Sequence, residues 1–399
     1  MNNETRKETQ VLPKDVRYVG ADDLTLPLFE NQYPVQPMGV SYNSYLILDE
    51  KIAVMDSVDA RAADEWLAKL AHELDGRSPD YLVISHMEPD HSGSILRLAE
   101  KYQEMKLVGN TKTFTMLRQF FGAKAPTDDR LLEVGEGETL PLGAHTLHFM
   151  LAPMVHWPEV MVAYEETEKL LFSADAFGRF GSLGRTANAP WAPQARRYYY
   201  NIVGKYGAQV QALLKKASAL EIKTVCPLHG PVLTGEALGE ALRLYDLWSR
   251  WQSESPDDIL LAHASIHGNT ARAAELFKQK LEAKGARVTL CDLTTTEVSY
   301  AVANAFYCGK LVLACSTYDG GLFPPMEEFL SHLQAKGFRS RTVGLMENGS
   351  WAPIAAKKMR AAFEKSRNIT FTDTTVTVTS ALNDDSCAKI DALAKELCR

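Results

Sequence analysis

Short apolar runs separated by polar segments dominate the first part of the chain. Runs of this kind are typical of buried strands, and we predict strands at residues 44–48, 52–55, 81–84, 148–151, 160–164, 170–172 and 224–226. Helical spacing of apolar positions predicts helices at residues 60–74, 92–102 and 237–248. The mixture indicates an α+β or four-layer αββα arrangement, with helices packed outside the sheets.

From about residue 256 the strand and helix patterns alternate regularly. We predict strands at residues 259–265, 288–291, 311–314, 342–346 and 369–378, and helices at 270–284, 326–336, 355–365 and 384–397. Gly285 is placed to end the first of these helices. Strands that alternate with helices in this way predict an α/β domain with a doubly wound parallel sheet.

The polar stretch Ser249–Pro256 separates the two patterns. With 399 residues the chain is too long for one ordinary core. We therefore predict an N-terminal domain at residues 1–255 and a C-terminal domain at 256–399.

Composition narrows the class of protein. Hydrophobic residues at 46% and charged residues at 23% are typical of a soluble globular protein. The net charge of −7 argues against a nucleic-acid-binding surface and favours the cytoplasm. No apolar run approaches the roughly 18 residues of a membrane span, and the polar N-terminus has no secretory pattern. The six cysteines form no Cys-x-x-Cys pair, which excludes a built-in iron–sulfur module.

Four potential metal ligands follow the apolar run at residues 81–84. They are His86, Glu88, Asp90 and His91. Carboxylates packed this densely repel one another unless a cation neutralises them. The pattern indicates a metal site, and one for two metals.

Three further polar residues also lie just past predicted strands. They are His156, Asp175 and His229. A single histidine near a strand end is more often structural than a ligand. Four strand ends with the same arrangement favour a metal site, because all of them could converge on one rim.

The ordered set His-x-Glu-x-Asp-His, His, Asp, His resembles the metallo-β-lactamase-like domain of the flavodiiron proteins. The stretches at residues 39–47, 156–159 and 173–178 resemble that family as well. The resemblance extends from about Val16 to the C-terminus. It implies a metallo-β-lactamase-like αββα sandwich followed by a flavodoxin-like domain.

One ligand position distinguishes zinc sites from iron sites in this superfamily. Its zinc hydrolases have a histidine where this chain has Glu88. A carboxylate in place of an imidazole makes the site harder and favours iron over zinc. The resemblance assigns His86, Glu88 and His156 to one iron and Asp90, His91 and His229 to the other, with Asp175 bridging. Asp175 and His91 are also the expected catalytic residues, although in some members the residue matching His91 turns away from iron.

Three loops at predicted strand ends resemble those with which flavodoxin holds FMN. Such loops present backbone N–H groups to a phosphate, and their glycines and aromatic residues allow contact with a flat ring. The resemblance assigns FMN contacts to Ser265, His267, Gly268, Asn269, Thr270, Ser316, Thr317, Tyr318, Asp319, Gly320, Gly321, Asn348, Gly349, Ser350 and Trp351. The phosphate contacts are expected at Ser265, His267, Gly268, Asn269 and Thr270.

The resemblance implies an oxidoreductase with FMN and two iron ions per subunit, reducing O2 to water, NO to N2O, or both. It also implies an external donor such as rubredoxin and a head-to-tail homodimer, alone or as a dimer of dimers. Neither gas is favoured by the residue types. Two alternatives stay open: a zinc hydrolase fused to a flavodoxin-like domain, and an electron carrier whose metal site is only structural.

Overall fold

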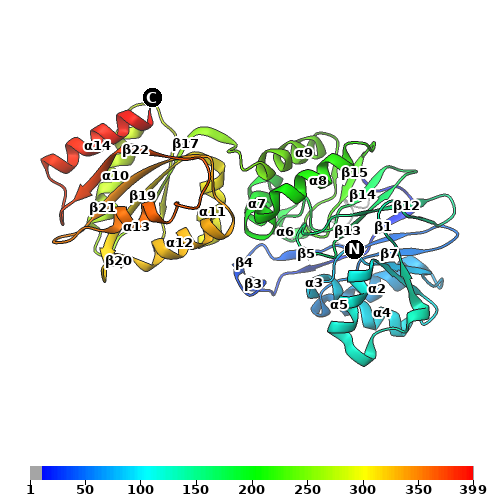
Figure 1. Ribbon diagram of the computed structural model, residues 1–399. Coiled ribbons are helices and arrows are strands. Elements are labelled where there is room, and N and C mark those ends of the chain that lie inside the picture. Colours follow the sequence, from blue (N-terminus) through cyan, green and yellow to red (C-terminus); the bar gives the residue numbers. More distant parts are fainter. Residues whose placement is uncertain (1–10, 399) are drawn as a thin grey trace. The chain divides into compact units, whose positions relative to one another are not determined.

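The computed structural model describes residues 11–398, which divide into two compact units. Residues 11–199 together with 208–246 form the N-terminal unit, and residues 200–207 together with 247–398 form the C-terminal unit (Figure 1). The predicted boundary between residues 255 and 256 stays a prediction. Within residues 11–398, every helix is too short or too polar to cross a membrane.

Two six-stranded sheets form the centre of the N-terminal unit. The first consists of β1 (Val16–Tyr18), β6 (Tyr45–Ile47), β7 (Ala53–Met55), β8 (Tyr81–Val83), β9 (Lys106–Gly109) and β10 (Leu131–Glu133), in this order. The second consists of β11 (Thr139–Pro141), β12 (Thr146–Leu151), β13 (Met161–Glu165), β14 (Leu170–Phe172), β15 (Thr224–Cys226) and β16 (Leu233–Thr234). One apolar core joins the sheets, with Ile47 and Val83 from the first and Phe149 and Phe172 from the second.

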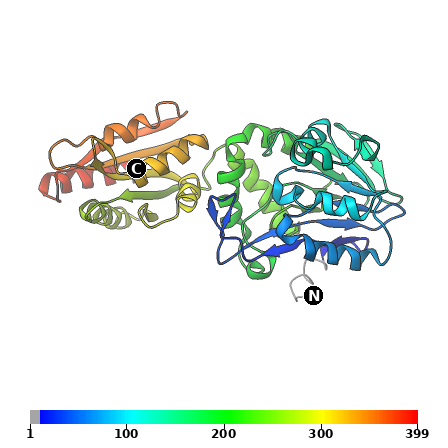
Figure 2. The same ribbon diagram turned by 90° about the horizontal axis from the view of Figure 1, so that it is seen from below.

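Helices flank these sheets, and two short strand pairs complete the unit (Figure 2). The helices are α2 (Ala63–Leu74), α3 (Pro89–Ser92), α4 (Ile95–Lys101), α5 (Thr111–Phe121), α6 (Leu183–Thr186), α7 (Trp191–Tyr198), α8 (Gly207–Ala217) and α9 (Gly235–Ser249). The pairs are β2 (Ala21–Asp23) with β5 (Val40–Tyr42), and β3 (Leu28–Phe29) with β4 (Tyr33–Pro34). In α2 the buried residues Trp66, Leu70 and Leu74 recur every four positions, which places them on one face of the helix.

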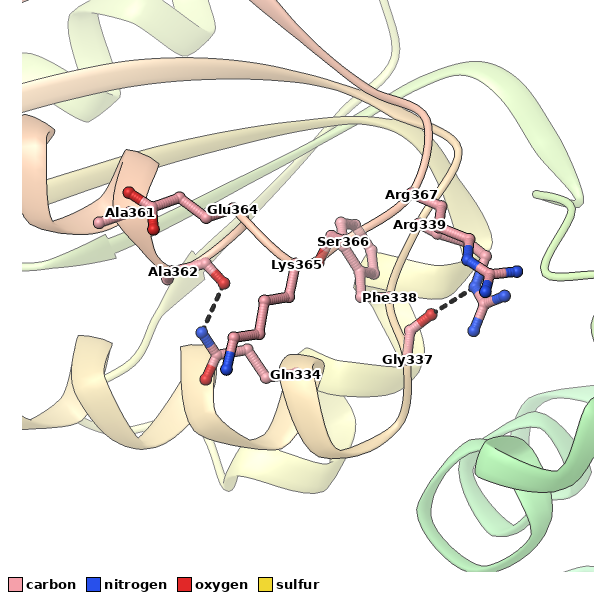
Figure 3. Close-up of a pocket in the computed structure, with 10 residues that line it drawn as sticks. All are labelled: Gln334, Gly337, Phe338, Arg339, Ala361, Ala362, Glu364, Lys365, Ser366 and Arg367. Atoms are coloured by element: carbon pink, nitrogen blue, oxygen red, sulfur yellow. Dashed lines mark hydrogen bonds between the residues drawn. The ribbon is translucent and has the colours of Figure 1, made fainter.

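The C-terminal unit is a doubly wound parallel sheet with strand order β18-β17-β19-β21-β22. Its elements are β17 (Ser255–Ala264), α10 (Asn269–Glu282), β18 (Val288–Asp292), α11 (Val298–Tyr307), β19 (Cys308–Tyr318), β20 (Gly321–Leu322), α12 (Pro324–Ala335), β21 (Arg341–Asn348), α13 (Ala355–Ala361), β22 (Ile369–Val378) and α14 (Asp384–Leu397). Phe277 of α10 and Ile390 of α14 share one core with Leu261 of β17. The ends of α12 and α13 border a surface hollow, beside the amino ends of β21 and β22 (Figure 3).

The predicted fold class is confirmed: an αββα sandwich is followed by a flavodoxin-like parallel sheet. Helix α11 was not predicted, because it is buried on several sides, with Ala301, Val302 and Phe306 all inaccessible, and so shows no helical alternation. Helix α5 was not predicted either, although an Asn110 capping box marks its start. Helix α13 is shorter than predicted, ending at Ala361.

Candidate functional site

The seven predicted metal ligands lie together at one rim of the N-terminal unit. Each follows a strand of one of the two sheets: β8 precedes the segment with His86, Glu88, Asp90 and His91, and β12, β14 and β15 precede the other three. Pro89 begins the short helix α3, so Asp90 and His91 lie in its single turn. Strand ends of both sheets therefore meet around one cluster of imidazoles and carboxylates.

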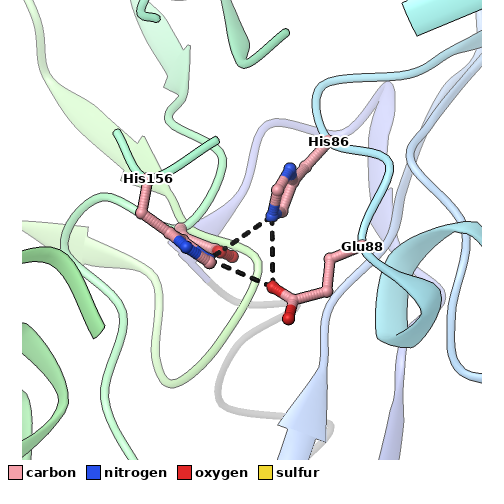
Figure 4. Close-up of side chains that lie close together, drawn as sticks. His86, Glu88 and His156 are labelled. Carbon is pink, nitrogen blue, oxygen red and sulfur yellow. Dashed lines mark hydrogen bonds and ion pairs between the residues drawn. The ribbon is translucent and has the colours of Figure 1, made fainter. Parts of the chain in front are cut away.

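Four side chains form the first group of the cluster: His86, Glu88, His156 and Asp175. Glu88 Oε2 lies 3.3 Å from His86 Nε2 and 3.1 Å from His156 Nε2. Asp175 Oδ2 lies 3.5 Å from His86 Nε2 and 3.0 Å from His156 Nε2. Figure 4 shows His86 and Glu88, from one segment, and His156, from another, pointing toward one another.

The second group contains Asp90, His91 and His229. Asp90 Oδ2 lies 3.4 Å from His91 Nε2 and 3.3 Å from His229 Nε2. Asp175 Oδ1 lies 3.2 Å from His91 Nε2 and 3.7 Å from His229 Nε2. The two carboxylate oxygens of Asp175 therefore face different groups, which is the geometry of a bridging ligand.

The inward-facing atoms of the cluster are buried and have no hydrogen-bond partner within residues 11–398. They include both carboxylate oxygens of Asp90 and Asp175 and the Nε2 atoms of His91, His156 and His229. Buried polar atoms in native proteins are almost always satisfied. A pair of divalent cations would satisfy all of these atoms, so the residues fit two metal ions.

Protons compensate the charge of this cluster when no metal is bound. Burial would lower the pKa of His91 and His156, but the charges of Asp90 and Asp175 raise the pKa of His91 to about 8, and Asp175 and Glu88 raise that of His156 to about 9. Burial would raise the pKa of Asp175, but the neighbouring histidines, His91 first, hold it well below its usual range. Metal binding at this site must therefore displace protons.

Buried acceptors orient two of the histidines from outside the cluster. Glu159 Oε1 lies 2.7 Å from His86 Nδ1 and also accepts a hydrogen bond from the Met87 N–H at 2.9 Å. The carbonyl oxygen of Ser41 lies 2.7 Å from His229 Nδ1. Such contacts fix the tautomer that leaves Nε2 free for a metal. No role was predicted for Glu159 from the sequence, although it stands three residues after His156.

Aromatic rings enclose the second group. The rings of Phe29 and Tyr198 lie 5.3 Å and 5.6 Å from that of His229. The Tyr198 hydroxyl is buried without a hydrogen-bond partner in the described part of the chain. Burial raises the pKa of Tyr198 well above its ordinary value, and the charges of Asp175 and Asp90 raise it further. This neutral hydroxyl therefore belongs to the surroundings of the cluster, which the sequence analysis did not anticipate.

A hollow of about 480 Å³ opens onto the cluster from the surface. It is lined by Glu88 and Asp90 of the cluster, by apolar side chains such as Leu28 and Phe29, and by Arg61. The hollow therefore reaches two of the carboxylates of the cluster.

The three predicted flavin-binding loops meet around a cavity of about 610 Å³ in the C-terminal unit. All of the predicted contact residues line it except Gly268 and Gly321, and Ile266, Ala352 and Ser380 line it in addition. Gly268, at φ 88°, precedes the N-terminus of α10, where free N–H groups attract a phosphate. Tyr318 and Trp351 are 44% and 92% exposed, so their rings are free to contact a flat ligand. These loops fit FMN.

The chain matches the model of the family described as "ODP family beta lactamase" over residues 40–230. It is 28% identical to rubredoxin-oxygen oxidoreductase of Megalodesulfovibrio gigas, covering 85% of each chain. It is 26% identical to anaerobic nitric oxide reductase flavorubredoxin of Vibrio vulnificus, covering 87% of this chain and 71% of the relative. It spans about half the length of the diflavin flavoproteins that it matches.

The fold is similar to the solved structure of rubredoxin oxygen:oxidoreductase from Desulfovibrio gigas. The TM-score is 0.89 at 24% identity, and 97% of each chain is covered. Both domains and the strand-end cluster occur here in one chain, as the sequence resemblance predicted. In sequence, in fold and in its strand-end cluster, this chain therefore resembles the flavodiiron proteins.

Proposed function

We propose that this protein is an oxidoreductase that reduces O2 to water, NO to N2O, or both, at two non-haem irons with electrons received through FMN. The observation that carries the proposal is the position of Asp175, whose two oxygens each face one group of histidines and carboxylates. A cluster of this kind suits a pair of metals rather than a single ion. The names of the relatives, an oxygen oxidoreductase and a nitric oxide reductase, support the same reaction class.

The ligand assignment follows the two groups. His86, Glu88 and His156 are proposed for one iron, Asp90, His91 and His229 for the other, and Asp175 for both. When bound, the irons and FMN supply electrons, and the flavin accepts them singly or in pairs. Glu88 and the other carboxylates supply hard oxygen ligands, which favours iron over the zinc of the hydrolases.

The surrounding residues position the ligands and exclude water. Glu159 and the Ser41 carbonyl hold His86 and His229 with Nε2 directed inward. Phe29 packs against His229, and Trp157 lies edge-on to His86 at 5.2 Å. Asp175 and His91 are the residues proposed to contact the reacting atoms.

The flavin cavity is proposed to hold FMN with its phosphate at residues 265–270 and its ring beside Tyr318 and Trp351. Thr270 Oγ1 and Ser316 Oγ are 2.8 Å apart, which ties two of the loops together. Residues 316–321 and 348–351 would contact the ring and its edge. The donor is proposed to be rubredoxin or a similar protein, the assembly a head-to-tail homodimer or a dimer of such dimers, and the location the cytoplasm.

Metal content and gas consumption together test this function. The purified protein should contain iron and FMN, and after anaerobic reduction with a supplied rubredoxin it should consume O2 or NO when each gas is added separately. Zinc without iron would revive the hydrolase alternative, which the names of the relatives do not favour. A flavin-loaded protein that consumes neither gas would support the electron-carrier alternative.

A further inference from the structure

A buried carboxylate, that of Glu347, lies near the carboxyl end of β21, directly before the third flavin-binding loop (residues 348–352). Glu347 is 8% exposed. The preceding residue, Met346, belongs to the core beneath α10 and α14, so Glu347 faces the other side of the sheet. No lysine or arginine within residues 11–398 forms an ion pair with Glu347, so this buried carboxylate has no cationic partner.

Two hydrogen bonds hold the Glu347 side chain in place. Its Oε2 accepts the N–H of Ala356 at 2.9 Å, and its Oε1 accepts the hydroxyl of Thr377 at 3.0 Å. Thr377 of β22 is the partner of Glu347 across the sheet, so strand pairing sets the second contact. Both carboxylate oxygens therefore act as acceptors, and both of their donors are neutral groups.

The bond to Ala356 also fixes the start of α13, which follows the third loop. The first N–H groups of a helix have no partner inside the helix. Here the Thr317 hydroxyl, in the second flavin-binding loop (residues 316–320), accepts the N–H groups of Ile354 and Ala355 at 3.0 Å and 3.2 Å. Glu347 accepts the next N–H along the chain. One helix end is therefore held by side chains from the second loop and from the base of the third, which keeps the two loops together.

The Glu347 carboxylate also places a charge beside the flavin cavity. Its neighbour Asn348 lines the cavity, whereas Glu347 itself does not. In buried surroundings the effective dielectric constant is low, so a charge acts over a longer distance than it would in water. Reduction adds electrons to a flavin ring, and a fixed negative charge nearby opposes that reduction. Glu347 can therefore act on a bound flavin without touching it.

We infer that Glu347 is a positioning residue of the flavin site, which holds the third loop through Ala356 and lowers the reduction potential of bound FMN through its charge. The inference rests on the proposed function, because it assumes that FMN occupies this cavity. A lower potential makes the reduced flavin a stronger reductant, which favours the onward transfer of its electrons.

Two variants of the full-length protein separate the effect of position from that of charge. Glu347→Gln removes the charge but keeps an acceptor for the Ala356 N–H, and Glu347→Ala removes both. The matched control is Glu396→Gln in α14, on the opposite face of the sheet, because Glu396 likewise accepts backbone N–H groups, those of Asp373 and Thr374. FMN affinity is measured by fluorescence titration of the flavin-free protein. The two-electron potential of the FMN-loaded protein is measured by anaerobic reduction beside a dye of known potential.

The glutamine variant should bind FMN within about threefold of the parent but be easier to reduce. The ratio of reduced to oxidised FMN at a given potential should rise about tenfold, which is the effect of removing a unit charge roughly 10 Å away at an effective dielectric constant of about 20. For two electrons this is an upward shift of about 30 mV. Glu347→Ala should in addition bind FMN at least about tenfold more weakly, because the Ala356 N–H loses its acceptor. The control should keep both the affinity and the potential of the parent.

An unchanged potential in Glu347→Gln would overturn the inference, and so would an equal shift in Glu396→Gln. Loss of FMN from Glu347→Gln would also overturn it, because the amide keeps the acceptor that is said to hold the loop. Neither measurement involves O2 or NO. A failure of gas reduction would therefore count against the proposed function alone, and an unshifted potential in an FMN-loaded variant would count against the inference alone. A parent protein that binds no FMN would contradict both.

Discussion

Replacement of Glu159 by glutamine tests whether the Glu159 carboxylate holds His86 in the orientation that binds metal. The Glu159 carboxylate is buried, lies 2.7 Å from His86 Nδ1 and accepts the Met87 N–H. Burial would raise the pKa of Glu159, but its hydrogen bond with His86 holds it below the ordinary value, so the group is ionised at neutral pH. An amide of nearly the same shape removes that charge and orients His86 less strictly.

The expected loss is a factor of about 10 to 100 in iron affinity, which is typical when the outer partner of a ligating histidine is removed. This corresponds to about 1.4 to 2.7 kcal/mol of binding free energy. The fold should tolerate the change because an amide oxygen in the place of Oε1 can still accept both hydrogen bonds. Titration of the metal-free protein with Fe²⁺ against a competing chelator measures the affinity directly.

The chain offers a matched control in Glu165. This carboxylate is also buried, and its Oε1 lies 3.1 Å from Nδ1 of the buried His145. Glu165 is the last residue of β13, at the other end of that strand from Glu159. Glu165→Gln should therefore leave iron affinity unchanged while it perturbs the local fold to a similar degree. The reasoning is refuted if Glu159→Gln binds iron as tightly as the parent, or if Glu165→Gln weakens binding by the same factor.

Three further predictions concern the cluster itself. Asp175→Ala should lose iron and gas reduction while FMN absorbance persists, and retained turnover would show that Asp175 does not bridge. Tyr198→Phe should keep its iron but shift the vibrational band of bound azide, because the buried hydroxyl is a free donor beside the second group; an unchanged band would place it away from the ligand. Without metal, His91 and His156 have pKa values of about 8 and about 9, so both are protonated below pH 8 and must lose these protons when iron binds. Iron affinity should therefore fall, as pH drops below 8, by about tenfold per pH unit for each proton displaced. An iron affinity that stays constant from pH 6 to 7.5 would contradict this.

Local patterns were sufficient to place the candidate ligands. His86, Asp175 and His229 each stand within a few residues of an apolar run, so the end of a buried strand could be recognised without tertiary information. Parallel β7, β8 and β9 direct the carboxyl end of β8 to one rim, which brings its loop toward the cluster. The regular alternation after residue 256 likewise predicted the parallel sheet.

Contacts between distant segments could not be predicted in this way. Glu159 reaches His86 across 73 residues, and nothing in its own neighbourhood indicates that contact. Tyr198 lies among three consecutive buried tyrosines, which in sequence look like ordinary core residues. The hollow beside the amino ends of β21 and β22 combines residues from the turns after α12 and α13, so it exists only once the sheet has formed.

Anomalous diffraction at the iron edge, from crystals grown with iron, would show whether the seven side chains hold two irons. Two peaks per chain are expected, one among His86, Glu88 and His156 and one among Asp90, His91 and His229, with Asp175 between them. A single peak, a signal at the zinc edge alone, or peaks away from these side chains would contradict it.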